Sequence, residues 1–132
     1  MSEEFDRSRC LDDLEGVSSG EPEFDTVLVT RCYALRKKPV GEFGVEDLRI
    51  MIGQEIGLPF LIPLALEILE VEPLAEGDYY PGDLLSNVLR VGETFWVRRP
   101  DCHARVGQIL RRLQTVPSEV SEAARSFTHG AF

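Results

Sequence analysis

The segment Leu58–Val71 constrains the fold of this chain more than any other, because it is almost entirely apolar and yet contains two prolines. Its apolar residues recur at helical spacing and also fill the remaining faces, a pattern typical of a helix that is buried on all sides. Proline is tolerated near the start of a helix, so Pro59 and Pro63 mark that start and Pro73 marks the end. The segment is shorter than the roughly 20 residues of a membrane span. We therefore expect a central core helix over about residues 60–72.

Amphipathic helices are predicted on both sides of this central helix. The preceding one begins near Val45, and Gly57 would supply its left-handed C-cap. Its inward residues are Leu48, Met51, Ile52 and Ile56. After the central helix, residues 73–82 form a loop, and Asp83 opens a third helix. The inward residues of that helix are Leu84, Leu85, Val88 and Leu89. Three short helices with brief connections predict a compact helical hub.

Shorter helices are expected toward both ends of the chain. A helix from its N-cap Asp25 to about Lys37 is favoured over a strand, because the apolar spacing continues beyond the β-branched run at 26–30. The others are a turn near 9–14, a helix over about 100–114 with Arg105, Arg111 and Arg112 outward, and a helix over about 119–127. We predict an all-α fold in one domain over 1–132, a compact bundle of about six to eight short helices around the central helix. Residues 1–8 and 128–132 are expected to be frayed, as untethered termini usually are.

The acidic balance of the chain limits its partners. Its 23 acidic and 14 basic residues give a net charge of −9, which argues against nucleic acid or an anionic membrane as a partner. The same charge favours a basic protein partner, although many acidic cytosolic proteins have no partner at all. The first ten residues lack the apolar core of a signal peptide, so a cytoplasmic location is expected.

No catalytic or metal-binding constellation is evident in the sequence. The three cysteines, Cys10, Cys32 and Cys102, are too widely spaced for a disulfide framework or a metal knuckle and are expected to be reduced, half-buried thiols. Cys102 and His103 are adjacent on a predicted helix and point to different faces, which argues against a thiolate pair. The acids lack the spacing of a calcium loop. We therefore expect no enzyme activity, no cofactor and no metal, and we expect Trp96 to cover the core more than to anchor an interface.

A loop with several acids and two tyrosines is the candidate binding surface. Between Arg49 and Arg90 the chain has no basic residue but seven acids, five of them from Glu70 to Asp83. Acids that flank exposed aromatic side chains suit a docking face for a basic partner, because charge speeds encounter and aromatic side chains act as anchors. The candidate residues are Glu70, Glu72, Glu76, Asp78, Tyr79 and Tyr80. The alternative is a solvated loop whose tyrosines cover the core edge, while Asp83 caps the next helix.

The sequence resembles immunity proteins of contact-dependent growth inhibition (CDI) at several long motifs. They are LRKKP (35–39), VEDLRIMIGQEIGLPFLIPLALEILE (45–70), PLAEGDYYPGDLLSNVLRV (73–91) and FW (95–96), and LDDLEG (11–16) and GEPEFDTVLV (20–29) fit the same pattern. The resemblance covers roughly residues 10–97. It implies a small cytosolic protein, not an enzyme, that binds and blocks the toxin domain of a cognate effector. No binding residue is transferred from the family, because the shared motifs look like scaffold.

Three functions are therefore compared. The first is an immunity protein that neutralises a toxin by stoichiometric occlusion, the toxin being a basic nuclease whose cationic groove meets carboxylates in place of phosphates. The alternative is a general α-helical adaptor or scaffold without a toxin partner, which explains the core equally well. A small hydrolase would need a cleft lined by paired acids, which the sequence does not show. The sequence leaves the oligomeric state, the activity of the toxin and the docking face open.

Overall fold

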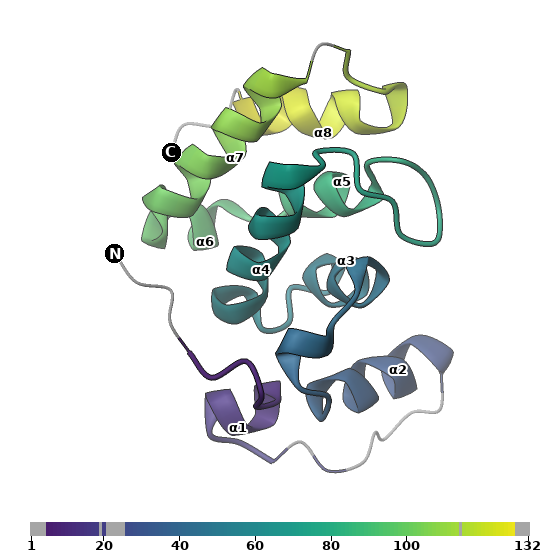
Figure 1. Ribbon diagram of the computed structural model, residues 1–132, viewed down its shortest axis with the longest axis vertical. Coiled ribbons are helices and arrows are strands. Elements are labelled where there is room, and N and C mark those ends of the chain that lie inside the picture. The colour runs from purple at the N-terminus through teal and green to yellow at the C-terminus, as the bar shows by residue number, and fades with distance from the viewer. Residues whose placement is uncertain (1–4, 19, 21–25, 114, 129–132) are drawn as a thin grey trace.

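The computed structural model describes residues 5–18, 20, 26–113 and 115–128, and helices joined by loops make up this part of the chain (Figure 1). Eight α-helices and one 3-10 turn follow one another, and the described residues contain no strand. The elements are α1 (Leu11–Glu15), α2 (Val27–Arg36), η1 (Val40–Glu42), α3 (Val45–Gly53), α4 (Leu58–Val71), α5 (Asp83–Leu89), α6 (Glu93–Arg98), α7 (Pro100–Arg112) and α8 (Ser118–Thr128). The predicted all-α bundle of short helices is confirmed.

Helix α4 lies at the centre of the bundle, as predicted (Figure 1). It contacts α3, α5 and α7. Its buried residues are Leu58, Leu61, Ile62, Pro63, Leu64, Ala65, Leu66 and Leu69. Val71 in the last turn is 83% exposed, so the helix is not buried on all sides along its whole length. Neither α4 nor any other described helix is long and apolar enough to cross a membrane.

The turn between α3 and α4 differs from the prediction. Gly57 has the expected left-handed backbone, with a φ of 68°, but it precedes α4 instead of ending α3. Helix α3 ends at Gly53, so Ile56 lies outside it. Glu55 has a φ of 55° in this turn, and its carboxylate accepts a hydrogen bond of 3.0 Å from the backbone N–H of Gly92. A left-handed residue other than glycine is thus held by a contact from a distant part of the chain, which local sequence does not reveal.

Helix α2 confirms the choice of helix over strand, but its N-cap is Thr26. The Oγ1 atom of Thr26 accepts a hydrogen bond of 3.1 Å from the backbone N–H of Val29, as expected for an N-cap residue. Asp25, the predicted cap, lies outside the described residues. Of this helix only Cys32 and Leu35 are buried, so α2 rests on the core along one narrow stripe.

Trp96 covers the core near the C-terminal helices, as predicted. Its side chain is 1% exposed, and its Nε1–H donates a hydrogen bond of 3.0 Å to the Val91 carbonyl. Its ring lies edge-on to that of Phe127 in α8, with a centroid distance of 5.5 Å. Helix α8 in turn packs against α5 and buries Val120 and Ala123. The aromatic contacts therefore attach the C-terminal helix to the core.

The N-terminal residues from Phe5 onward are attached to the bundle, contrary to the prediction that residues 1–8 are frayed. The Phe5 ring packs edge-on against Phe60 of α4, with a centroid distance of 5.2 Å. The guanidinium of Arg7 donates hydrogen bonds of 3.0 and 2.5 Å to the Glu67 carboxylate. Helix α8 ends at Thr128, and residues 1–4 and 129–132 lie outside the described part of the chain.

The cysteines have free thiols that lie somewhat deeper than predicted. Cys32 and Cys102 are buried, and Cys10 is partly buried. Burial raises the pKa of the Cys32 thiol. The thiols therefore act as small apolar groups in the packing.

Candidate functional site

The predicted site residues lie on or beside the loop formed by residues 72–82, which joins α4 to α5 and which we call the acidic loop (Figure 1). Its exposed acids are Glu72, Glu76 and Asp78. Tyr79 exposes 70% of its surface, whereas Tyr80 packs partly against the core. Glu70 lies before the loop, in the last turn of α4. The structure therefore gathers five of the six predicted residues on one loop and sets Glu70 apart.

Glu70 connects α4 to α7. Its carboxylate accepts two hydrogen bonds from the Arg105 guanidinium, at 2.8 and 2.9 Å, and its backbone carbonyl accepts another from Arg112. The hydrogen-bonded Arg105 lowers the pKa of Glu70. Arg105 and Arg112 were expected to face outward, but they reach back to the end of α4. Glu70 thus differs from the other candidates in that a basic residue already compensates its charge.

Asp83, the first residue of α5, holds the backbone of the acidic loop. Its side chain is 2% exposed, and its carboxylate accepts hydrogen bonds from the backbone N–H groups of Gly77 at 2.7 Å, Tyr79 at 3.0 Å and Tyr80 at 3.4 Å. The loop also closes at its base, where Gly82 N–H donates to the Leu74 carbonyl at 3.1 Å. A buried carboxylate that receives backbone donors of one loop fixes the path of that loop. The sequence predicts that Asp83 caps α5, but Gly82 is the N-cap of this helix and the Asp83 carboxylate binds the preceding loop instead.

Glu46 of α3 also binds the backbone of this loop. Its carboxylate accepts a hydrogen bond of 2.8 Å from the backbone N–H of Asp78 and two, of 2.7 and 2.5 Å, from the Arg49 guanidinium. The bonded guanidinium lowers the pKa of Glu46. A Cβ atom on Gly77 would collide with an oxygen of the Glu46 carboxylate and lie 3.1 Å from an Asp83 oxygen, so a side chain at this position would displace the Glu46 carboxylate. Two carboxylates from two helices therefore bind the backbone of the loop.

Arg49 joins these carboxylates to the exposed tyrosine. Its Nε atom lies 3.9 Å from an oxygen of Asp83, and its Cζ atom lies 4.2 Å from the centroid of the Tyr79 ring. This is the geometry of a cation–π contact. Sequence reasoning missed both Glu46 and Arg49. Their spacing of three residues predicts a pair on one helix face, but not the contact of that pair with a loop that lies 30 residues further along the chain.

The surface of the acidic loop combines unpaired negative charge with an exposed ring. No ion pair within the described residues involves Glu72, Glu76 or Asp78, whereas Glu46 and Asp83 compensate the charge of Arg49. The described residues also contain no group of three His, Cys, Asp or Glu side chains that could hold a metal ion. Carboxylates beside an exposed aromatic ring suit the binding of a cationic surface.

Comparison with known proteins identifies the family. A model of the CDI immunity proteins matches residues 13–106, which is most of the chain. The chain belongs to the CDI immunity protein family. A search of the curated proteins gives no match. Membership assigns this CDI immunity protein a toxin-neutralising role, implies a cognate toxin as its partner and places it among proteins that are in general inhibitors, not enzymes.

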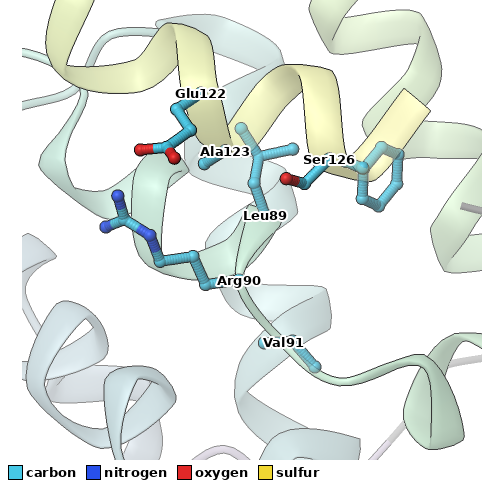
Figure 2. Close-up of a pocket in the computed structure, with 7 residues that line it drawn as sticks. Leu89, Arg90, Val91, Glu122, Ala123 and Ser126 are labelled. Carbon is cyan, nitrogen blue, oxygen red and sulfur yellow. The ribbon is translucent and has the colours of Figure 1, made fainter. Parts of the chain in front are cut away.

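The part that matches the CDI immunity family includes α3, α4, α5 and the acidic loop but leaves out α8. Together with the end of α5, α8 borders a cavity of about 430 Å³. Its lining residues are Leu89, Arg90, Val91, Glu122, Ala123, Ser126 and Phe127 (Figure 2). Figure 2 shows Arg90 and Glu122 extending to the same side of this cavity. No predicted site residue lines it, so the cavity and the acidic loop are separate features of the molecule.

Proposed function

We propose that this CDI immunity protein neutralises its toxin in the cytoplasm by stoichiometric occlusion, and that the acidic loop is the docking surface. The observation that carries the proposal is the exposed ring of Tyr79 beside three exposed acids that form no ion pair with any residue the structure describes, on a backbone held in place by Asp83 and Glu46. A preorganised loop binds with less loss of conformational entropy than a mobile one. The aromatic ring supplies the anchor and the acids supply the electrostatic attraction.

The toxin partner in this proposal is a basic protein. The chain carries a net charge of −9, and its longest stretch without a base, residues 50–89, contains the acidic loop. Opposite charge on the toxin would accelerate association and make it sensitive to salt. A nuclease is the toxin class that fits, because its substrate groove presents cations to phosphate groups. The carboxylates of the acidic loop would then occupy positions that phosphates otherwise take.

The test is the binding of the toxin domain encoded beside this gene to a loop variant and to a matched control. The loop variant E72Q/E76Q/D78N removes three charges from the acidic loop. The control D13N/E42Q/E93Q removes three exposed charges from α1, η1 and α6, outside the acidic loop. We expect the loop variant to weaken the Kd at least about tenfold, or ~1.4 kcal/mol, and the control to change it much less.

Three outcomes separate the parts of the proposal. Rescue of growth in toxin-producing cells, with nanomolar binding that weakens in salt and in the loop variant, supports occlusion by the acidic loop. Rescue with equal loss in both triple variants keeps the immunity role and rejects this docking surface. Absence of both rescue and binding would leave the chain as an α-helical adaptor without this toxin as partner.

A further inference from the structure

We infer that Arg49 is the positioning residue of the docking surface, which holds the Tyr79 ring in the orientation that the toxin meets. The inference rests on the proposed docking role of the acidic loop. The Cζ atom of Arg49 lies 4.2 Å from the centroid of a ring that is itself 70% exposed. The Arg49 side chain is only 13% exposed, so a partner reaches the tyrosine and not the guanidinium beneath it.

Arginine is suited to this position because it serves three partners at once. Its planar fork donates two hydrogen bonds to Glu46, its Nε atom faces Asp83 at 3.9 Å, and its Cζ atom lies over the Tyr79 ring. Lysine would keep the positive charge near both carboxylates but would lose the fork and the stacking face. Because Glu46 and Asp83 also bind the loop backbone, Arg49 ties the ring to the same two groups that fix the loop.

The contact matters for binding because an exposed tyrosine on a loop otherwise samples several rotamers. Fixing a side chain on association reduces affinity, and a ring that is already held in the free protein avoids that loss. The charge of Arg49 is compensated by its carboxylate partners, so a cation of the toxin can approach the ring without net repulsion from below. Arg49 thus acts on the toxin through Tyr79.

The experiment compares Arg49→Lys with Arg36→Lys. Arg36 is a matched control, because its guanidinium also binds two carboxylates, those of Asp12 and Glu15, and its side chain is 17% exposed. It lies in α2 and bonds to α1, away from the acidic loop. Titration calorimetry with the toxin domain reports the Kd, and reversible unfolding of half the protein would raise the apparent Kd only about twofold, well short of the expected effect.

We expect R49K to raise the Kd about tenfold, because it removes the cation–π contact and the order that this contact imposes on the ring. We expect R36K to leave the Kd near that of the parent protein. The double variant R49K/Y79A should bind no more weakly than Y79A alone, because Arg49 acts through the ring. Tyr79→Leu tests the same contact from the other side. It keeps an apolar group but removes the π face, and we expect it to weaken binding at least as much as R49K.

Each alternative result has a defined meaning. Equal Kd values for R49K and R36K, with weakened binding in Y79A, would overturn the positioning role and leave the docking surface intact. Additive losses in R49K/Y79A would also overturn it, because Arg49 would then act on the toxin by another route. Unchanged binding in Y79A and Y79L would reject the proposed docking surface itself.

Discussion

The substitution Asp83→Asn tests how the acidic loop is held. The Asp83 carboxylate is buried and accepts two short hydrogen bonds, from Gly77 and Tyr79, and a longer one from Tyr80. Asparagine has the same shape, but only one of its two terminal atoms accepts hydrogen bonds. Its NH₂ group would face a backbone N–H of the loop, so at least one of the short bonds is lost.

The expected magnitude follows from these contacts. Hydrogen bonds to a charged group contribute ~1.5–3 kcal/mol each, and the loss of one short bond with weakening of the others gives about 2–4 kcal/mol for local opening of the loop. Since ~1.4 kcal/mol is a factor of ten, hydrogen exchange at the backbone amides of Gly77 and Tyr79 should accelerate roughly 30- to 700-fold.

Amide hydrogen exchange measured by NMR separates local from global effects. Leu66 and Leu69 in α4 are buried and serve as internal references. Asp13→Asn, an exposed substitution in α1, removes the same charge and should leave all these rates unchanged. Unchanged protection of Gly77 and Tyr79 in D83N would refute the assignment of Asp83 as the support of the loop. An equal acceleration at Leu66 and Leu69 would instead mean that the substitution unfolds the whole bundle.

Two further predictions concern the core and the carboxylates. Trp96→Ala should lower the free energy of unfolding, measured in urea, by about 3–5 kcal/mol, because it leaves a buried cavity and removes the hydrogen bond to the Val91 carbonyl. Weaker toxin binding without a loss of stability would instead make Trp96 an interface residue. Hydrogen bonds from Arg49 and Arg105 lower the pKa values of Glu46 and Glu70 below their ordinary 4.5, so both groups stabilise the fold fully above that pH. The urea midpoint should therefore fall as the pH is lowered from about 4.5 through the depressed pKa values, and a midpoint that rises on acidification would contradict the direction of these shifts.

The helices could be predicted from the sequence because the spacing of apolar residues within one short segment indicates which of its faces is buried. The apolar run of α4 and the Pro81-Gly82-Asp83 start of α5 are local signals, and both helices occur where they were expected. The wrong predictions involve contacts between distant residues. Arg7 attaches the N-terminal segment through Glu67, 60 residues away, and no local pattern indicates that bond.

The candidate site was predictable in composition but not in organisation. Acids and tyrosines that cluster in sequence identified the acidic loop. The engagement of Glu70 depends on Arg105 from α7, and the supports Glu46 and Arg49 come from α3. The number of charges along a chain does not show which carboxylates form ion pairs within the protein, because the tertiary fold determines which basic residues lie beside them.

The way the acidic loop is held bears on how such a protein can acquire a new specificity. The carboxylates of Asp83 and Glu46 hold the loop by accepting hydrogen bonds from backbone N–H groups, which every residue except proline possesses. Gly77 has a crowded Cβ position and Tyr80 packs against the core, but the hydrogen bonds from the backbone of Asp78 and Tyr79 do not depend on the side chains of these two residues. In the docking role proposed for the loop, substitutions at Asp78 or Tyr79 would change the surface that meets the toxin and leave these backbone hydrogen bonds in place. When a loop is held through its backbone, its side chains can change during evolution and bind a different partner while the residues of the core stay the same.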